Sequence, residues 1–590
     1  MDLRWSLDKL YTSFDSEEFK RDLLKTEESL DIFNLWVIKN TADTKQIVKK
    51  LEEFVKINND FSELIGKLFA YCNLTINVDT KNQQALHNLE ILEEKLTALA
   101  APSSKFLKWL GAIDDLNDKI KKSDILKEHN FILMENKMLS KYILDEKEEV
   151  LISKLKNTGS NSWSKLKDLL VSNLLIDINI DGVDKKLPLP AIRNMAYEKN
   201  GELRKKAYEV ELNSYKTIED SVAACLNSIK GESLTINKMK GYKSILDETL
   251  IHSRMDEQSL DAMLSALKES LPAFRRFFKR KSELLGNSKG LPFYDLFAPM
   301  GEVNMTYTYE EARDFIVANF RTFSHKLADF ALNAFNKNWI DAEPREGKVG
   351  GAFCYNLHSI GESRIMSNFS GSFSDVVTLA HELGHGYHGY CLDSQTELNS
   401  SYPMPIAETA STFCETIIKK AAIRTATKDE AFAILEAEIS DCGQVIVDIY
   451  SRYLFETELF KRREKNSLSV QELKEIMLSA QKEAYGEGLD EDFLHPYMWL
   501  CKPHYYYTDS HFYNFPYAFG LLFAKGLYAE YLEKGDDFVT TYDKLLSVTG
   551  KNKISDITKL VGIDVHSIDF WRNSLNLIEK DIDEFIKLSK

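Results

Sequence analysis

The sequence predicts a mainly α-helical protein with only small β elements. Gly (26) and Pro (12) are scarce among the 590 residues, whereas Leu, Lys and Glu, which favour helices, are abundant. Apolar residues also recur at helical spacing, as at Leu86, Leu89, Leu92, Leu96 and Leu99, which is typical of a helix with one buried face. Hydrophobic residues make up 44% of the chain and charged residues 28%, so a large buried core is expected.

The chain is longer than one hydrophobic core usually organises, so we expect more than one structural lobe. Isoleucines alternate with polar residues over 176–180, and Asp181-Gly182 follows. This pattern predicts a strand that enters a tight hairpin turn. Helical periodicity resumes soon after it. We therefore place a domain boundary near residue 195, with an N-terminal helical region over 1–195 and a second region over 196–590.

A second break in the helical pattern, over 345–372, is rich in Gly, Ser and aromatic residues. We interpret it as two short strands, near Ala352–Leu357 and Arg364–Phe369. A helix is expected to follow directly, with Ser374 as its N-cap. The sequence therefore predicts a small β-sheet beside this helix.

Composition and charge exclude several classes of function. The net charge is -16, and no dense stripe of Lys and Arg with interleaved aromatic residues occurs, which argues against nucleic-acid binding. The seven cysteines are scattered and form no CxxC, which fits a reducing compartment. The acidic N-terminus does not resemble a signal peptide, and no apolar run approaches the ~18–20 residues that cross a bilayer. We expect a cytoplasmic protein that binds neither nucleic acid nor membrane.

The most informative motif is His381-Glu382-Leu383-Gly384-His385. Residues four apart lie on one face of a helix, so both imidazoles can bind one metal ion. Glu382 lies about 100° further around the helix, where it can reach a metal-bound water as a general base. The pattern predicts one catalytic Zn²⁺ per chain, at a site that also suits cobalt or manganese.

A catalytic zinc site needs a third protein ligand and keeps one position for water. The HExxHxxGxxH pattern fails, because Cys391 stands where its last histidine would be. Two prolines at 403 and 405 favour the start of a later helix, and Glu408 falls in its first turns. We assign Glu408 as the third ligand. Ser411 and Glu415 follow on the same helix, and we expect them to orient a ligand by hydrogen bonds.

Other ligand assignments remain open at this point. Glu415 could be the ligand, with Glu408 as its outer partner. Glu397 is nearer in sequence but lies in a polar loop. His388 lies on the face of the two motif histidines, yet three histidines along one straight helix span two turns, which is too far for one ion. We expect His388 to pack in the core or to hydrogen-bond near the site.

Two segments at the motif resemble a known family. VTLAHELGH at 377–385 and ETASTFCE at 408–415 are similar to the oligoendopeptidase F branch of the thimet-oligopeptidase-like zinc peptidases. LRWSLDKLY at 3–11 and YDL at 294–296 are also similar to this family. The resemblance extends over most of the chain and is sharpest from about 345 to 520.

The resemblance implies a fold and a ligand set. It implies a two-lobed helical shell around a deep substrate channel, with the zinc at the channel wall. It also implies that Glu408 is the third ligand, and that a small N-terminal family domain covers roughly 110–185. The catalytic zinc metallopeptidase domain would then occupy 196–590.

The family also places a histidine and several tyrosines beyond the metal helices, where they bind the oxyanion and the substrate. His504 best matches that histidine, and Tyr513 and Tyr517 best match the tyrosines. The spacing of this segment departs from the family pattern, so His511 is a rival for His504.

These observations predict a metalloendopeptidase that cuts short peptides. Glu382 would take a proton from the metal-bound water and pass it to the leaving amine. The substrate would lie extended and pair with the backbone of the second predicted strand. The expected substrate-binding residues are Arg364, Ile365, Met366, Ser367 and Asn368. A channel in a closed shell would admit oligopeptides and exclude folded proteins.

Two alternatives to an endopeptidase follow from the same residues. A carboxypeptidase or dipeptidase would need a basic residue that grips the C-terminal carboxylate of the substrate, and Arg364 is one candidate. A non-catalytic peptide-binding protein would carry a structural zinc closed by a fourth protein ligand. Cys391 is the nearest soft ligand for that role.

Overall fold

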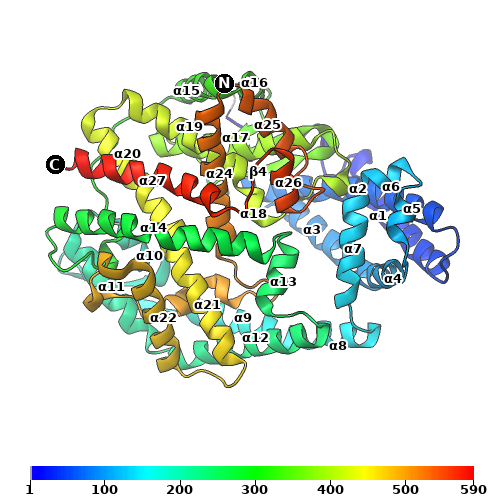
Figure 1. Ribbon diagram of the computed structural model, residues 1–590, viewed down its shortest axis with the longest axis horizontal. Coiled ribbons are helices and arrows are strands. Elements are labelled where there is room, and N and C mark those ends of the chain that lie inside the picture. Colours follow the sequence, from blue (N-terminus) through cyan, green and yellow to red (C-terminus); the bar gives the residue numbers. More distant parts are fainter. Residues whose placement is uncertain (1–2) are drawn as a thin grey trace. The chain divides into compact units, whose positions relative to one another are not determined.

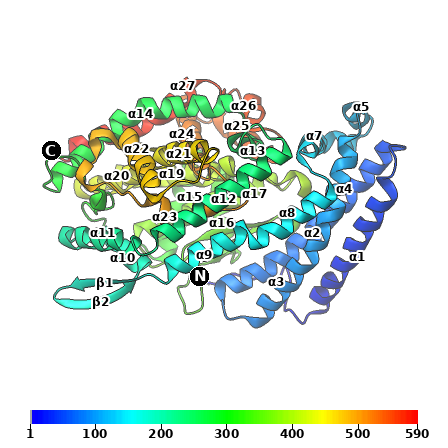
Figure 2. The same cartoon turned by 90° about the horizontal axis from the view of Figure 1, so that it is seen from below.

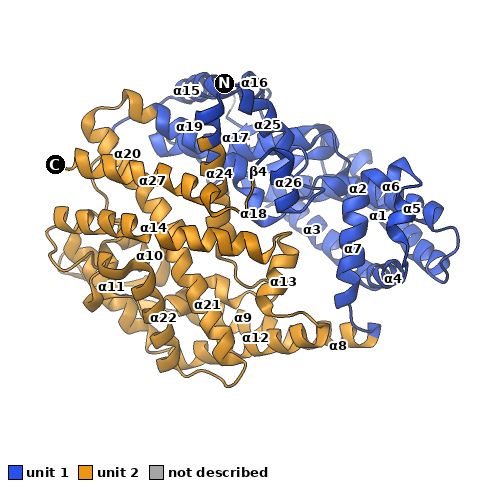
Figure 3. Cartoon of the chain, in the orientation of Figure 1, with its two compact units in different colours: residues 1–146, 304–421, 530–563 blue, residues 147–303, 422–529, 564–590 orange. Residues whose placement is uncertain are grey.

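The computed structural model describes residues 3–590 (Figure 1). Helices dominate the described chain, whose named strands form one two-stranded and one three-stranded sheet. The predicted mainly α fold with small sheets is therefore confirmed. The chain forms two compact units, each assembled from separate stretches of sequence (Figure 3). Unit 1 holds residues 1–146, 304–421 and 530–563, and unit 2 holds 147–303, 422–529 and 564–590. The predicted boundary near residue 195 lies inside unit 2.

The first stretch of unit 1 contains helices and, among its described residues, no strand. It contains α1 (Glu17–Asn40), α2 (Ile47–Val78), α3 (Gln83–Leu96), η1 (Thr97–Leu99), α4 (Ala100–Gly111), α5 (Leu116–Ile120), α6 (Asp124–Glu128), α7 (Asn130–Leu139) and η2 (Ser140–Tyr142). Aromatic packing joins these helices, because Phe54 of α2 stacks on Phe106 of α4 with ring centroids 3.6 Å apart. The apolar stripe on α3 is buried only in part: Leu92 is fully buried, but Leu86 is 39% exposed.

The remaining stretches of unit 1 carry the three-stranded sheet and the motif helix. Their elements are α15 (Tyr309–Phe323), α16 (His325–Asn336), β3 (Ile340–Asp341), β4 (Phe353–Leu357), η5 (His358–Ile360), β5 (Glu362–Met366), α17 (Phe373–Leu392), η6 (Glu397–Asn399), α18 (Met404–Ala407), α19 (Thr409–Thr425), α25 (Asp537–Leu546) and α26 (Ile554–Leu560). The last turn of α19 extends past residue 421 into unit 2.

The three-stranded sheet has the order β3-β5-β4. β4 pairs with β5 in antiparallel register, from Phe353 opposite Met366 to Leu357 opposite Glu362. β3 pairs with β5 in parallel. Both β4 and β5 contact α17. The two strands predicted here are confirmed, as is their position beside the motif helix, although β5 begins two residues and ends three residues earlier than expected.

Unit 2 is helical apart from one hairpin. Its elements are α8 (Glu146–Thr158), α9 (Ser160–Ser172), β1 (Leu175–Ile180), β2 (Val183–Pro188), α10 (Leu189–Asn194), η3 (Met195–Tyr197), α11 (Gly201–Tyr215), α12 (Glu219–Lys240), α13 (Ile245–His252), α14 (Glu257–Leu284), η4 (Phe293–Asp295), α20 (Lys428–Gly443), the π-helix η7 (Gln444–Asp448), α21 (Ile449–Arg463), α22 (Val470–Tyr485), η8 (Gly486–Gly488), η9 (Glu491–Phe493), α23 (Met498–Cys501), η10 (Pro503–Tyr506), α24 (Phe515–Lys534) and α27 (Ile568–Leu588). The first residue of α8 and residues 530–534 at the end of α24 belong to unit 1.

The predicted hairpin is confirmed, and Figure 2 shows β1 and β2 side by side. Asp181 and Gly182 both have positive φ, 51° and 83°, as a two-residue type I′ turn requires. Ile176 and Ile178 are buried and join a core formed with α11, α12, α21 and α22. Within residues 3–590, no helix combines the length and the apolar character needed to span a bilayer.

Candidate metal centre

The motif helix α17 begins with a capping box. The Ser372 hydroxyl accepts a hydrogen bond from the Asp375 amide at 3.1 Å, and the Asp375 carboxylate accepts one from the Ser372 amide at 3.1 Å. The predicted N-cap, Ser374, is therefore wrong by two residues. Beyond the cap, Val376, Leu379 and Leu383 are buried, and they fix the rotation of the helix about its own axis.

Three side chains of unit 1 place their ligand atoms at the corners of a small triangle. His381 Nε2 and His385 Nε2 are 3.1 Å apart, and each lies 3.3 Å from Glu408 Oε2. Ligands about 2.0–2.1 Å from a tetrahedral zinc ion are separated from one another by about 3.3–3.4 Å. The triangle therefore has the size that one zinc ion needs.

The three ligand side chains are only partly buried, with 19–32% of each side chain exposed. This exposure leaves room on one side of the triangle for a fourth ligand from solvent. Such an open position is typical of catalytic rather than structural zinc sites.

Glu408 enters the site at a break between two helices. It follows the short helix α18 and has φ -88° and ψ 6°, and α19 begins at the next residue. The backbone of α19 lies against Gly384 of α17, and a Cβ added to Gly384 would lie 2.5 Å from Ala410 O and 2.6 Å from Ser411 Cα. A glycine at 384 therefore allows the close helix contact that brings Glu408 to the two imidazoles.

Two further residues of α19 hold the ligands by hydrogen bonds. The Ser411 hydroxyl donates to Glu408 Oε2 at 2.8 Å. The Glu415 carboxylate lies 2.5 Å from His381 Nδ1 and is itself paired with Lys419 at 2.9 Å. The contact to Nδ1 directs Nε2 of His381 toward the centre of the triangle. Glu415 thus contacts the far side of the imidazole, whereas Glu408 lies at the triangle.

The electrostatic environment of the triangle is strongly negative. Burial disfavours the charged imidazolium of His381, but hydrogen bonds to Glu408 and Glu415 outweigh burial and raise its pKa to about 10. Burial also opposes ionisation of Glu408, yet the two histidines lower its pKa well below the usual range. A divalent cation is the ligand that such an arrangement favours, and its binding would release the proton from Nε2 of His381.

Glu382 lies beside the triangle, and its carboxylate is not one of the three corner atoms. The residue is 5% exposed, and its Oε2 has no hydrogen-bond partner. Burial raises the pKa of its carboxyl, although the neighbouring histidines act in the opposite direction. Its ligand atom lies within 4.8 Å of those of His381 and His385. A buried carboxylate with a free oxygen at this distance can exchange a proton with a water in the triangle.

The alternative ligands are engaged elsewhere. His388 is fully buried, bonds the Thr549 hydroxyl at 2.9 Å and stacks on Tyr402; burial lowers its pKa to about 3. Glu397 pairs with His358 at 2.9 Å. Cys391 lies six residues beyond His385, about 120° around the helix, and burial raises the pKa of its thiol to about 12.

The sequence predicts that the substrate backbone pairs with the strand now seen as β5, but the sheet order argues against that position. β5 is the middle strand of the sheet, and on its β3 side the amides of Ile365 and Ser367 bond the carbonyls of Trp339 and Asp341. At Ile365 and Met366 the backbone of β5 is therefore already paired on both sides. Among the described residues, β3 and β4 are the two outer strands of this sheet, and β4 pairs only with β5.

Arg364 is not available to grip a substrate carboxylate. It is 2% exposed, and its guanidinium donates to Ser6 O at 2.8 Å and to the Glu362 carboxylate at 3.0 Å. Ile365 and Met366, which were expected to bind substrate, are also buried. Arg364, Ile365 and Met366 all lie in β5, the middle strand of the sheet.

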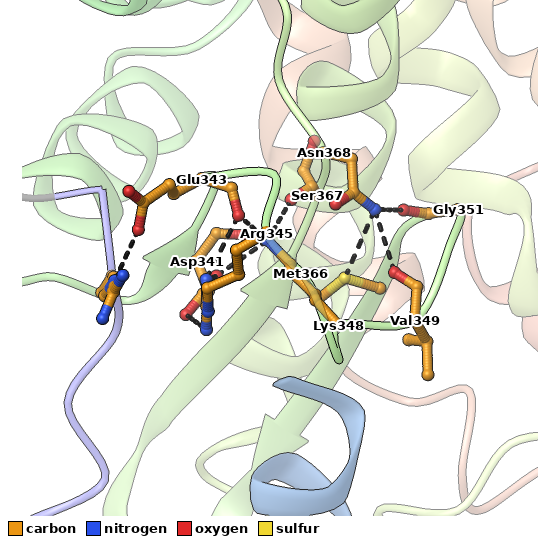
Figure 4. Close-up of polar contacts among 10 residues, drawn as sticks. Asp341, Glu343, Arg345, Lys348, Val349, Gly351, Met366, Ser367 and Asn368 are labelled. Carbon is orange, nitrogen blue, oxygen red and sulfur yellow. Dashed lines mark hydrogen bonds and ion pairs between the residues drawn. The ribbon is translucent and has the colours of Figure 1, made fainter. Parts of the chain in front are cut away.

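Ser367 and Asn368 hold the loop that leads into β4 (Figure 4). The Asn368 amide donates to the carbonyls of Val349 and Gly351 at 3.0 and 3.1 Å. The Lys348 ammonium donates to Ser367 O at 2.6 Å. Ser367 and Asn368 thus fix the loop that precedes β4.

His504, Tyr513 and Tyr517 lie together in unit 2. The ring of His504 is 5.3 Å from that of Tyr513 and 6.0 Å from that of Tyr517. Burial, together with Arg452 and Lys502, lowers the pKa of His504 to about 4, so its imidazole is neutral at pH 7. Its rival His511 is buried, and its Nδ1 lies 3.2 Å from the Lys230 ammonium.

Sequence reasoning missed two residues that position the site. Lys419 fixes Glu415, and its spacing of four residues on one helix was a readable signal. Asn356 of β4 donates to the main-chain carbonyl of His385 at 3.2 Å. This hydrogen bond connects β4 to the motif helix α17. That contact joins distant parts of the chain, so no local pattern reveals it.

Residues 194–577, more than half of the chain, match the sequence signature of peptidase family M3. The chain belongs to peptidase family M3. Residues 112–175 also match a signature described as oligopeptidase F, and the predicted family resemblance is confirmed. The M3 signature covers both the motif helix and Glu408 in unit 1, and the histidine and tyrosines of unit 2.

Relatives of this M3 chain are similar over almost its whole length. Oligopeptidase PepF of Bacillus subtilis is 24% identical over 91% of this chain and 81% of its own. An oligoendopeptidase F homolog of Lactococcus lactis is 23% identical over 99% and 97%. Among solved structures, oligoendopeptidase-F from Enterococcus faecium aligns with a TM-score of 0.72 at 17% identity, over 97% of this chain and 99% of its own. A protein from Chlamydophila abortus aligns with a TM-score of 0.85 at 22% identity, over 99% and 98%.

We expect Gly384→Ala to weaken metal binding sharply. The added methyl would meet the backbone of α19 at 2.5 Å, so the helices must separate and Glu408 must leave the triangle. Gly350→Ala is the matched control, because nothing lies within 4 Å of a Cβ at that position. Metal content after dialysis, measured by atomic emission, should fall for the first variant and stay near one ion per chain for the second. Equal retention by both variants would contradict this account.

Proposed function

We propose that the chain is a zinc-dependent endopeptidase that hydrolyses internal bonds of short peptides. The observation that carries this proposal is the triangle formed by His381 Nε2, His385 Nε2 and Glu408 Oε2, with sides of 3.1–3.3 Å and Glu382 beside it. Membership of peptidase family M3 and relatives named as oligoendopeptidases support peptide hydrolysis and oligopeptide substrates.

The zinc ion would be held by His381, His385 and Glu408, and when bound it would lower the pKa of a ligated water to about 7 and polarise the scissile carbonyl. Glu382 would accept the proton of the attacking water and deliver it to the leaving amine. Its burial and raised pKa favour a carboxylate that takes and returns a proton. Glu415 and Ser411 would keep the ligands in this geometry.

The substrate would lie along β4 rather than β5. An extended peptide can pair with the backbone of an outer strand, and such pairing reads main chain more than side chains. β4 contacts α17, and Asn356 bonds the His385 carbonyl. A peptide on this strand would therefore run beside the motif helix. Broad tolerance of substrate sequence is expected.

His504, Tyr513 and Tyr517 would bind the developing oxyanion and the substrate. A neutral imidazole, as the lowered pKa of His504 implies, can donate one N–H to an oxyanion and remain uncharged. His511 is less suited to this role, because its Nδ1 faces the buried Lys230 ammonium. The two-lobed channel and the cytoplasmic location stay predictions that accompany this function.

The two alternatives lack a supporting contact. Arg364 is buried and bonded to Glu362 and Ser6, so it offers no grip for the terminal carboxylate that a carboxypeptidase recognises. Cys391 lies among Tyr387, Lys326 and Asp543, which removes the reason to propose it as a fourth ligand of a structural zinc. An endopeptidase therefore remains the function that the site supports best.

A mixed peptide library, with products identified by mass spectrometry, tests the proposed function. We expect internal cuts that disappear with chelator and return with zinc. Glu382→Gln should keep one zinc per chain and lose at least about 10²-fold in kcat, because only the proton acceptor is removed. Products shortened only from one end would indicate an exopeptidase, and turnover by Glu382→Gln near that of the natural chain would refute the role of Glu382.

Glu408→Ala should lose both metal and activity, because one of three ligand atoms disappears. Glu397→Ala is the matched control, since that carboxylate pairs with His358 instead. Zinc stoichiometry by atomic emission and peptide cleavage would be measured side by side. One bound zinc per chain in Glu408→Ala would show that the third ligand lies elsewhere.

Tyr517→Phe should lower kcat with little change in zinc content. Loss of one oxyanion donor typically costs about 10²–10³-fold in kcat. Tyr507→Phe serves as the control, because Tyr507 also packs against His504 but does not match the family tyrosines. Equal kcat values for the two variants would argue against an oxyanion role for Tyr517.

A further inference from the structure

Unit 2 contains a cavity of about 580 Å³ that the proposed peptidase mechanism does not use. Its walls come from α9, α10, η3, α11, the segment around η4, the π-helix η7 and α23, all within unit 2. The volume lies within the ~300–1,000 Å³ that small-molecule sites occupy. The cavity therefore has the size of a binding site for a small organic molecule.

Positively charged groups face this cavity. Lys502 follows α23, and its ammonium has no hydrogen bond or ion pair with any residue of the chain from 3 to 590. Burial, together with Arg452, lowers the pKa of Lys502, although Asp448 acts in the opposite direction. Arg193 also lines the cavity and uses one guanidinium nitrogen on Glu211, at 3.3 Å.

A buried acceptor also lines the cavity without a partner. His495 is 2% exposed, and its Nε2 lies 3.4 Å from the Glu211 carboxylate, so Nε2 carries the proton and donates. In the neutral imidazole the other nitrogen, Nδ1, is then an acceptor, and it has no hydrogen-bond partner. Buried polar atoms are normally paired. A ligand N–H or O–H at this point would satisfy Nδ1.

The rest of the lining is aromatic and aliphatic. Phe293 packs on the His495 ring with centroids 5.0 Å apart, and Tyr197 and Phe297 pack together at 5.0 Å. Tyr197 is 61% exposed and marks the side that is open to solvent. Gln444, which lines the cavity, begins a π-helix, an element that occurs frequently at functional sites.

We propose that this cavity binds a small carboxylate that carries an aromatic body and an N–H group, such as an aromatic amino acid derivative. The carboxylate would pair with the Lys502 ammonium and with the guanidinium N–H groups of Arg193 that do not face Glu211. The N–H would donate to Nδ1 of His495, and the ring would pack against Phe293 and Phe297. The ligand thus supplies an anion for Lys502, a donor for Nδ1 of His495 and an apolar ring that matches the aromatic lining.

Titration calorimetry with N-acetyl-L-phenylalanine tests this site. The full-length chain is used with excess chelator, so that the carboxylate cannot bind a metal at His381, His385 and Glu408. We expect saturable binding at one molecule per chain. N-acetyl-L-phenylalaninamide, which lacks the charge, and acetate, which lacks the ring, should each bind at least tenfold more weakly. Absence of saturable binding of the first compound would overturn the proposal.

Two variants test the location of the site. Lys502→Met should weaken binding about tenfold or more, because a charge-assisted hydrogen bond is lost, and Lys186→Met on exposed β2 is the matched control. Ser172→Phe, at the wall formed by α9, should block the cavity without a change of charge. Unchanged affinity in both Lys502→Met and Ser172→Phe would place the ligand elsewhere. Because metal is absent from the assay, this outcome does not depend on the proposed peptidase function.

Discussion

The close contact of α17 with α19 at Gly384 is the constraint on which the candidate metal centre depends. Two ligands come from α17 and the third precedes α19, so the triangle forms only if the two backbones approach closely. A Cβ at Gly384 would lie 2.5 Å from Ala410 O, closer than real Cβ atoms come to a backbone oxygen. Glycine costs a helix about 1 kcal/mol relative to alanine, and here that cost permits the site.

The same contact concentrates negative charge in a partly buried place. Glu382, Glu408 and Glu415 all lie near His381, and burying carboxylates is unfavourable unless they are paired. Lys419 pairs with Glu415, and Ser411 bonds Glu408, but Glu382 keeps an oxygen without a partner. A cation in the triangle would stabilise this arrangement, so metal binding and the stability of unit 1 should be linked.

Local patterns predicted the local features well and the long-range ones poorly. The hairpin followed from Asp181-Gly182, since few residues other than Asn, Asp and Gly adopt positive φ readily. The strand order of the three-stranded sheet could not be predicted from the sequence. β3 is only two residues long, Ile340–Asp341, too short for a periodic signal, yet its pairing makes β5 the middle strand. Likewise, α17 begins after Ser372 rather than after Ser374, because Asp375 stands three residues after Ser372 and completes a capping box with it.

The exchange of roles between β4 and β5 has a physical consequence for the site. Asn356 of β4 bonds the carbonyl of His385, and its side chain lies so close to Gly389 that an added Cβ there would be 2.3 Å away. The Ser363 hydroxyl of β5 donates to Oδ1 of Asn356 at 2.9 Å, so this side chain of β4 is held by both α17 and β5. β4, one of the two outer strands, is thus fixed directly to the helix that carries both histidines. A peptide that pairs with β4 would inherit this register, so the position of its scissile bond would depend on main-chain contacts rather than on the identity of its side chains.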